Sequence, residues 1–102
     1  MKILLFAGTG DGHELALWLR EKKIPFTVSV ATEYGEALLP EGMEVHVGRM
    51  DVPAMADLMG RGYTLVVDAT HPYAVEVTRN IRAAAEAASY FFSLFFTLSQ
   101  LL

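Results

Sequence analysis

The chain has 102 residues, of which 53% are hydrophobic and 20% charged, and its formal net charge is −4 at pH 7. This size fits one small domain, and the apolar content excludes an intrinsically disordered chain. The acidic balance gives no electrostatic basis for binding nucleic acid or a membrane surface, and the lack of cysteine excludes disulfides and thiol nucleophiles. Without a signal sequence, a cytoplasmic location is expected.

Short apolar runs alternate with amphipathic segments along residues 2–88. The continuous run Lys2–Ala7 is typical of a central parallel strand that is covered on both faces. Three further strands are predicted at Phe26–Ala31, Val45–Gly48 and Leu65–Ala69. Helices are predicted at Gly12–Lys22, in a short turn up to Leu39, at Pro53–Met59 and at Tyr73–Ala88. In the first helix, Leu15, Trp18 and Leu19 are expected to form the buried stripe.

This alternation predicts an α/β fold, a Rossmann-like open parallel sheet of about four strands with flanking helices. Right-handed crossovers bring the carboxyl ends of all four strands to one edge. In such sheets, ligands bind at this edge, near the point where the strand order reverses. The segments expected there are Gly8–Gly12, Ala31–Tyr34, Gly48–Asp51 and Asp68–Tyr73.

The segment Gly8–Gly12, here called the glycine turn, is the sharpest local signal. Glycines directly after a strand allow a tight turn and the close approach of a phosphate, which the N–H groups of the next helix then face. The spacing is Gly-x-Gly-x-Gly, not the Gly-x-Gly-x-x-Gly of dinucleotide-binding folds, and no P-loop lysine follows. A dinucleotide-binding turn and a plain tight turn are both open interpretations.

The end of the second strand lacks the acidic residue that usually holds the ribose 2′-hydroxyl in NAD-preferring sites. Ser29 and Thr32 stand there instead, and Arg49 follows the third strand. These residues would tolerate a 2′-phosphate, which favours NADP over NAD. The alternative for Arg49 is a solvated cation that pairs with Asp51.

A dense polar cluster, Asp68–Tyr73, follows the fourth strand. It could contact a cofactor, bind a substrate carboxylate or donate a proton, with His71 as its titratable group. Alternatively, Thr70 or His71 simply caps the last helix. The other two histidines are expected on a helix surface (position 13) and inside a strand (position 46), and their spacing predicts no metal site.

The composition changes abruptly near Ala88. All twenty charged residues lie in residues 2–86, whereas the last fourteen residues hold four of the six phenylalanines. A helix of fourteen residues would be about 21 Å long, too short to cross a bilayer. We interpret residues 1–88 as a dinucleotide-binding half domain and residues 89–102 as an aberrant apolar tail from truncation or a frame shift, with packing into a core as the alternative. Its aromatic residues could cause self-association or aggregation.

Four motifs in this order resemble the precorrin-6A reductase family of cobalamin biosynthesis, in its N-terminal half. They are Ile3–Gly12, Ser29–Gly35, Val47–Asp51 and Val67–Ala74. The resemblance implies two Rossmann-like domains that bind reduced nicotinamide dinucleotide, NADPH or NADH, toward the cleft between them. It also implies hydride transfer to a double bond of precorrin-6A or of its cobalt form.

The same resemblance implies roles for individual residues. The expected cofactor-binding residues are Gly8, Thr9, Gly10, Gly12, Ser29, Thr32, Arg49 and Thr70. His71 and Tyr73 would face the tetrapyrrole substrate. No residue is a persuasive acid–base catalyst, so positioning would supply most of the rate. Two departures are His13, where the family more often has arginine, and the length. Because family members are longer, weak cofactor binding and no turnover are expected from this chain alone.

Two other classes of protein share parts of this pattern. A short-chain-dehydrogenase-like module would need a Tyr-x-x-x-Lys pair, which neither Tyr34 nor Tyr73 begins. A receiver-like domain would need an acidic cluster after the first strand and a late lysine, but no lysine follows Lys23. A non-enzymatic α/β fragment that binds a nucleotide or a partner is the open alternative to the reductase.

Overall fold

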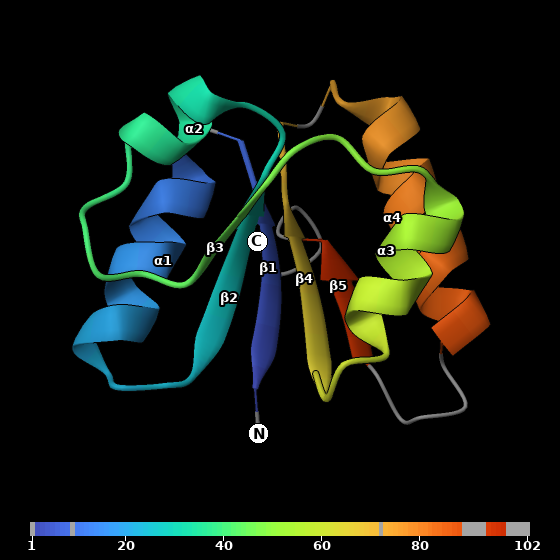
Figure 1. Cartoon of the computed structure of the whole chain (residues 1–102), viewed down its shortest axis with the longest axis horizontal. Coiled ribbons are helices and arrows are strands. Elements are labelled where there is room, and N and C mark those ends of the chain that lie inside the picture. The colour runs from blue at the N-terminus through green and yellow to red at the C-terminus, as the bar shows by residue number, and fades with distance from the viewer. Residues whose placement is uncertain (1, 9, 72, 89–93, 98–102) are drawn as a thin grey trace.

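Five parallel strands form a single sheet in the spatial order β3-β2-β1-β4-β5 in this computed structural model (Figure 1). The structure describes residues 2–8, 10–71 and 73–88, and the backbone of residues 94–97. The strands are β1 (Ile3–Ala7), β2 (Phe26–Val30), β3 (Val45–Val47), β4 (Leu65–Ala69) and β5 (Leu94–Thr97).

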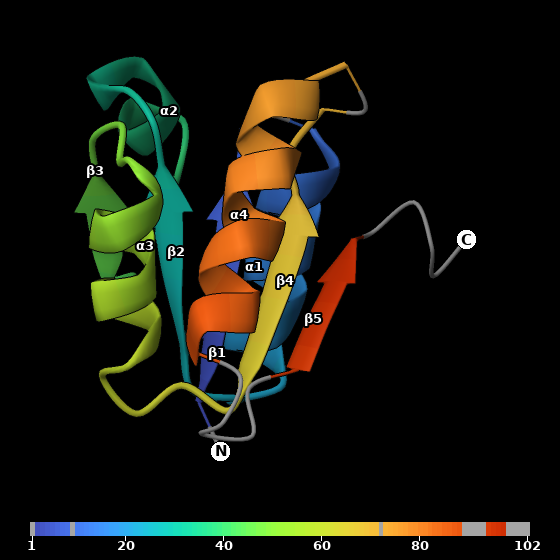
Figure 2. The same ribbon diagram turned by 90° about the vertical axis from the view of Figure 1, so that its right-hand side faces the viewer.

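The helices of the described residues lie in two layers, one on each face of the sheet (Figures 1 and 2). One face is covered by α1 (Asp11–Glu21) and α2 (Glu33–Ala37), and the other by α3 (Val52–Met59) and α4 (Val75–Ala88). The strand order explains these layers. The chain moves outward from β1 through β2 to β3, and then it crosses back over the sheet to β4.

Alternate residues of β1 belong to two separate hydrophobic cores. Leu4 and Phe6 pack in the core beneath α3 and α4. Ile3, Leu5 and Ala7 pack in the core on the α1 side of the sheet. Every residue of β1 is therefore buried, which explains the unbroken apolar run in the sequence.

The predicted strands and helices of residues 2–88 agree with the structure to within one or two residues. The difference that matters most is the start of α4, at Val75 rather than at Tyr73. Before this helix the chain forms a separate turn, in which the backbone N–H of Ala74 donates to the carbonyl oxygen of His71 at 2.8 Å. The polar cluster after β4 thus precedes the helix and lies outside its first turn.

The structure confirms the predicted fold class and adds one strand to the four predicted. β5 pairs in parallel with β4, and it lies in the segment that the sequence analysis interprets as an aberrant tail. An uncharged apolar segment can pair with the open edge of a sheet. The loss of charged residues after residue 86 therefore does not mark the end of the sheet. Residues 89–93 and 98–102 lie outside the described residues, so self-association through this segment and its origin by truncation or frame shift stay predictions. Within the described part of the chain, no helix is long and apolar enough to cross a membrane.

The face of α1 that packs on the sheet consists mainly of small residues and differs in part from the predicted buried stripe. The buried residues of this helix are Gly12, Ala16 and Leu19, at spacings of four and three. Trp18, predicted to be buried, is 49% exposed. Because glycine and alanine have little or no side chain, the helix lies close to the strands, and the large indole ring is turned to the surface.

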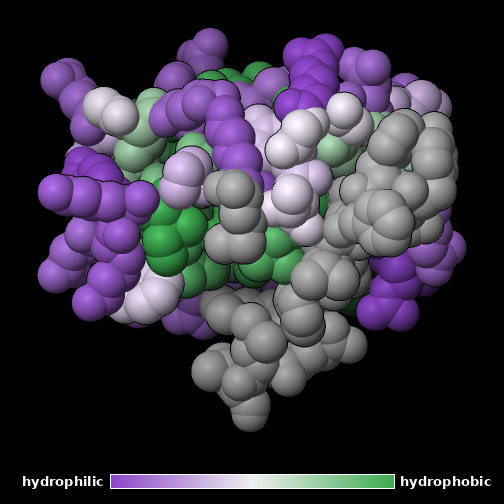
Figure 3. All heavy atoms as spheres, turned by 90° about the horizontal axis from the view of Figure 1, so that it is seen from below, coloured by the Kyte–Doolittle hydropathy of each residue, from purple (hydrophilic) through white to green (hydrophobic). Residues whose placement is uncertain are grey.

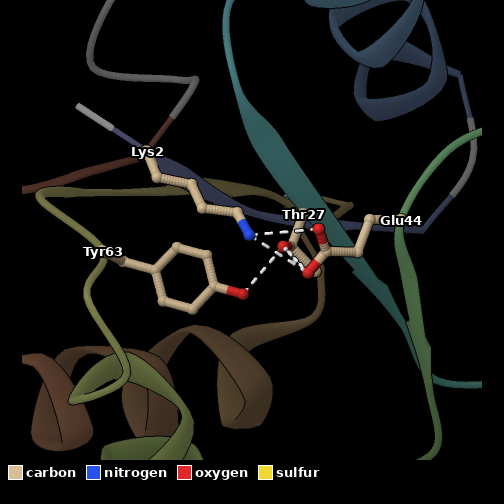
Figure 4. A network of polar contacts seen from close by, with 4 residues as sticks. All are labelled: Lys2, Thr27, Glu44 and Tyr63. Atoms are coloured by element: carbon tan, nitrogen blue, oxygen red, sulfur yellow. Dashed lines mark hydrogen bonds and ion pairs between the residues drawn. The ribbon is translucent and has the colours of Figure 1, made fainter.

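A polar network lies at the amino ends of the strands, opposite the predicted ligand edge (Figure 4). The Tyr63 hydroxyl donates to Thr27 Oγ1 at 2.7 Å, and the Thr27 hydroxyl donates to Glu44 Oε1 at 2.9 Å. Lys2 Nζ lies 3.0 Å from Glu44 Oε2 and 5.5 Å from the centre of the Tyr63 ring. The hydrogen bond from Lys2 lowers the pKa of Glu44, and the same bond raises the pKa of Lys2.

Seen from this end, the surface mixes hydrophilic and hydrophobic residues (Figure 3). A groove of about 310 Å³, here called the lower groove, lies near the amino end of β2. It is lined by Arg20, Lys23, Ile24, Pro25, Phe26, Gly42, Met43 and Glu44. The lower groove contains no residue of the predicted site.

Candidate functional site

The glycine turn and the polar cluster after β4 meet at the carboxyl edge of the sheet. β1 and β4 are direct neighbours, and Ala7 pairs with Ala69 at the ends of the two strands. The strand order reverses between them. From β1 the chain adds β2 and then β3 on one side, whereas β4 and β5 lie on the other side of β1. Such a switch point is where open α/β sheets form their ligand crevice. The expected placement of the two segments is confirmed.

The glycine turn leaves its backbone accessible. A methyl group added at Gly8 would meet no other atom within 4 Å. Gly10 has a φ angle of 62°, in the left-handed region that favours glycine, and it stands at the N-cap of α1 without a side-chain cap. The first-turn N–H groups of α1 therefore donate no hydrogen bond to an N-cap side chain. Thr9, predicted to bind the cofactor, lies outside the described residues.

Gly12 has a packing role in the same turn. A Cβ atom at this position would lie 2.7 Å from the Cβ of Ala7 and 3.1 Å from the carbonyl oxygen of Ala69. Only glycine lets the start of α1 approach both β1 and β4 this closely. In dinucleotide-binding turns, one glycine has this helix–strand packing role. The phosphate contact predicted for Gly12 stays a prediction in addition to this packing role.

Asp68 holds the chain where it leaves β4. Its side chain is 3% exposed, and its Oδ1 atom accepts hydrogen bonds from the backbone N–H and the hydroxyl of Thr70. Its Oδ2 atom accepts a hydrogen bond from the hydroxyl of Thr78, one turn into α4. Three donors thus satisfy this buried carboxylate and fix the corner between strand and helix. The role of Thr78 was not predictable from the sequence, because an isolated threonine in a helix does not indicate a contact with a neighbouring strand.

His71 and Tyr73 form an exposed pair in the turn between β4 and α4, and neither lines the cavity at this edge. The backbone N–H of Tyr73 donates to His71 Nδ1 at 3.1 Å, and the ring centres lie 5.0 Å apart with an angle of 37° between the planes. This bond closes a turn before α4 begins, and the Thr70 hydroxyl donates to Asp68. The alternative in which Thr70 or His71 caps the last helix is therefore wrong. A neutral His71 whose Nδ1 accepts this bond carries its proton on Nε2.

A cavity of about 320 Å³ opens at the carboxyl edge, on the side of the sheet covered by α3 and α4. Its lining consists of Phe6, Ala7, Ser29, Val30, Ala31, Gly48, Arg49, Met50, Met55, Thr70, Glu76, Val77 and Asn80. Three of the predicted cofactor residues are among them, Ser29, Arg49 and Thr70. Glu76 and Asn80 are additions from α4, which the sequence did not single out because helix positions were judged only by their apolar stripe.

The side chains of Arg49 and Thr32 differ in whether they already interact with other residues of the protein. Arg49 is exposed and forms no ion pair with a described residue, so the predicted pairing with Asp51 is wrong. Asp51 instead caps α3, with its Oδ1 accepting from the N–H of Ala54 at 3.0 Å. Thr32 is outside the cavity lining and caps α2 by accepting from the N–H of Gly35 at 3.1 Å. The guanidinium of Arg49 is thus available to a ligand.

Two histidines carry buried ring nitrogens that have no hydrogen-bond partner among the described residues, Nε2 of His13 and Nδ1 of His46. His46 is half-buried in β3, as predicted. His13 was expected on the helix surface, but it is also half-buried, because α1 lies close to the sheet at its first turn. Among the described residues, no group of three or more histidines or carboxylates is arranged to hold a metal ion.

A protein-family model described as "Precorrin-6x reductase CbiJ/CobK" matches residues 2–94. This chain belongs to that family. Among the curated relatives, a cobalt-precorrin-6A reductase of Priestia megaterium is 37% identical over 89 residues, covering 84% of this chain and 35% of the relative. Another, from Salmonella typhimurium, is 34% identical over 93 residues, covering 89% of this chain and 35% of the relative. The chain thus spans about a third of the length of these CbiJ/CobK proteins.

A solved structure supports the fold of this CbiJ/CobK chain. The structure of a CobK precorrin-6A reductase superposes with a TM-score of 0.79 and 23% sequence identity, and the match covers 95% of this chain and 36% of that protein. At this identity the match shows a shared fold. The family membership itself, a reductase family of cobalamin biosynthesis, confirms the resemblance predicted from the four sequence motifs.

Proposed function

We propose that this chain forms the dinucleotide-binding part of a precorrin-6A reductase that acts in the cytoplasm. When bound, NADPH or NADH supplies hydride to a double bond of precorrin-6A or of its cobalt form, and a proton completes the reduction. The observation that carries the proposal is the meeting of the glycine turn and the Asp68–Tyr73 corner at the switch point, next to the pair Ala7 and Ala69.

The glycine turn fits a diphosphate. The open space at Gly8 admits a ligand atom close to the backbone, and the left-handed conformation of Gly10 aims the chain into α1. The start of an eleven-residue helix favours negative charge, because its first N–H groups and its dipole both face the turn. Gly12 would serve by keeping α1 close to the strands, so that these groups stay in place.

The residues around the cavity support a preference for NADPH. Arg49 is in the lining and forms no ion pair with a described residue, and a guanidinium binds phosphate oxygens in pairs. Ser29 and Thr70 line the same cavity, and Thr32 stands at the end of β2, where the ribose would lie. NADPH is therefore the proposed coenzyme, with NADH as the alternative.

The pair His71 and Tyr73 would contact the tetrapyrrole. Tyr73 is 88% exposed, and an exposed phenol ring can pack against the face of a tetrapyrrole ring. The proton of a neutral His71 on Nε2 points away from the turn that holds Nδ1, which makes Nε2 a donor for a carboxylate of the substrate. Neither residue needs to act as an acid or base in this role. They would hold the ring at the coenzyme.

Replacement of Gly8 by alanine tests the phosphate contact separately from folding. The methyl group meets no atom of the protein, so the free energy of unfolding should change by less than about 0.5 kcal/mol. It would occupy the space proposed for the phosphate, so the affinity for NADPH in a fluorescence titration should fall by about tenfold. Gly60→Ala is the control, because Gly60 ends α3 away from the switch point. Equal affinity of Gly8→Ala and the unchanged chain would show that the phosphate lies elsewhere.

Turnover is the second test. Because the match covers only 35% of each of these curated relatives, we expect the purified chain to bind NADPH weakly and not to reduce precorrin-6A. The assay follows NADPH consumption together with the absorption of the tetrapyrrole. Full turnover by the 102 residues would show that the second domain, on the other side of the cleft, is not needed for the reaction.

A further inference from the structure

The cavity at the carboxyl edge contains two opposite charges that do not neutralise each other. Arg49 enters its lining from the loop after β3, and Glu76 enters from the first turn of α4. Neither side chain forms an ion pair with a described residue, and the other lining residues are uncharged. A ligand in the cavity therefore experiences one cationic and one anionic group from two different walls.

The helix that carries Glu76 is anchored to the end of β4. Glu76 lies between the turn closed by His71 and the hydroxyl of Thr78, which donates to the buried carboxylate of Asp68. Asn80, one helical turn after Glu76, lines the same cavity. The start of α4, which carries Glu76, is thus anchored to the end of β4, so the carboxylate stays beside the cavity.

We propose that Glu76 limits the preference of this site for a phosphorylated ribose and so determines, together with Arg49, which coenzyme is bound. This inference rests on the proposed function, because it concerns the nucleotide in that site. A 2′-phosphate carries between −1.5 and −2 charges near neutral pH, by analogy with other phosphate monoesters. Arg49 attracts this group, and Glu76 repels it. An unphosphorylated ribose has no such charge, and its hydroxyls can donate hydrogen bonds to the Glu76 carboxylate.

The size of the cavity makes this repulsion effective. A sphere of the cavity's volume is about 8.5 Å across, which is close to one Debye length at physiological salt. The charges of Glu76 and of a phosphate in the cavity are therefore incompletely screened from each other. Removal of the carboxylate charge should change the affinity for the phosphorylated ligand by roughly three- to tenfold.

The test uses two nucleotides that differ only in the phosphate in question, 2′,5′-ADP and 5′-AMP. Their dissociation constants are measured by calorimetry for the unchanged chain and for Glu76→Gln, which keeps the shape of the side chain. We expect Glu76→Gln to strengthen binding of 2′,5′-ADP by roughly three- to tenfold and to leave 5′-AMP within about twofold. Arg49→Gln should act in the opposite direction, and both effects should shrink at high salt.

Glu21→Gln is the matched control, because it removes the same charge from the exposed end of α1, distant from the carboxyl edge. If Glu76 only stabilises the start of α4, then Glu76→Gln lowers the melting temperature but leaves the ratio of the two affinities unchanged, and the inference is overturned. If the unchanged chain binds neither nucleotide, the proposed function fails first and the inference fails with it. A changed ratio in Glu21→Gln as large as that in Glu76→Gln would also overturn it, since net charge would then explain the effect.

Discussion

Gly8 and Gly12 lie in one turn, but an added side chain would meet different surroundings at the two positions. At Gly8 there is open space, whereas at Gly12 a Cβ would lie within 3.1 Å of two atoms of Ala7 and of a backbone oxygen of Ala69. The sequence presents both as equivalent members of one glycine motif. The structure separates them into one position with room for a ligand and one position required for packing.

Gly12→Ala should therefore destabilise the fold. The methyl group pushes α1 away from β1 and β4, and overpacking of this kind costs about 1–3 kcal/mol. Chemical denaturation of the variant measures the loss, with Gly8→Ala as the control from the same turn. A Gly12→Ala variant as stable as Gly8→Ala would show that α1 shifts without cost, and the close packing would then have no structural importance.

The site positions that could be predicted from the sequence are those set directly by the backbone, in a turn or at the end of a strand. Gly10 needs its positive φ, and Asp68 and Thr70 come directly after a buried strand. The residues that it missed, Glu76 and Asn80, project from a helix into a cavity that only the packing of α4 beside the sheet creates. Their spacing of four predicts a shared helix face but not what that face meets. Trp18 was misplaced for the same reason, since helical spacing alone does not distinguish a large buried residue from a small one.

At the scale of the elements, the join between α1 and β2 contains a strained residue. Lys23 has a φ angle of 59°, while its neighbour Lys22 has a φ of −80° in the ordinary helical region. The N–H of Ile24 donates to the carbonyl oxygen of Leu19 at 3.0 Å, which closes the helix end around Lys23. Glycine is the usual residue at this place, because a side chain in the left-handed region is unfavourable.

Lys23→Gly should stabilise the protein by about 1 kcal/mol, because glycine adopts the left-handed conformation without a steric penalty. Lys22→Gly removes the same charge at a right-handed position and should instead destabilise the protein. Thermal unfolding of the two variants compares them directly. Destabilisation by both changes would contradict this expectation. It would mean that contacts of the Lys23 side chain in the lower groove stabilise the fold by more than its backbone strain destabilises it.

The sheet itself was largely predictable from the alternation of elements. Each of the four predicted strands is a short apolar run bounded by turn residues, and the parallel arrangement follows from the intervening helices. β5 was not predictable in this way, because residues 89–102 contain no charged residue, glycine or proline to mark the ends of a strand. Its place became visible through pairing with β4, which involves residues far apart in the chain.

For the whole molecule, the network at the amino edge predicts a dependence of stability on pH. The pKa of Glu44 is lowered, first by the hydrogen bond from Lys2 and then by that from Thr27. A carboxyl with a lowered pKa in the folded state stabilises the fold above its ordinary pKa, and this contribution is lost as the pH falls through the folded value. Stability should therefore decline below about pH 4 in part through Glu44.

Glu44→Gln should reduce this acid-induced loss, as measured by the melting temperature between neutral and acidic pH. Because both partners are substantially exposed, the effect should be small and should shrink in high salt. Glu41→Gln, in the same connection before β3, is the control, since Glu41 forms no hydrogen bond or ion pair with a described residue. Identical pH profiles of both variants and the unchanged chain would show that the network contributes nothing to stability.

The most direct test of a dinucleotide site at the switch point is an NMR titration of the ¹⁵N-labelled chain with NADPH. We expect shifts concentrated in the backbone amides of the carboxyl edge, in Gly8–Gly12, Ala31–Thr32, Gly48–Arg49 and Thr70–His71. Amides around the lower groove, in Arg20–Phe26 and Gly42–Glu44, should stay unchanged. Shifts confined to the lower groove, or no shifts at saturating NADPH, would contradict the account.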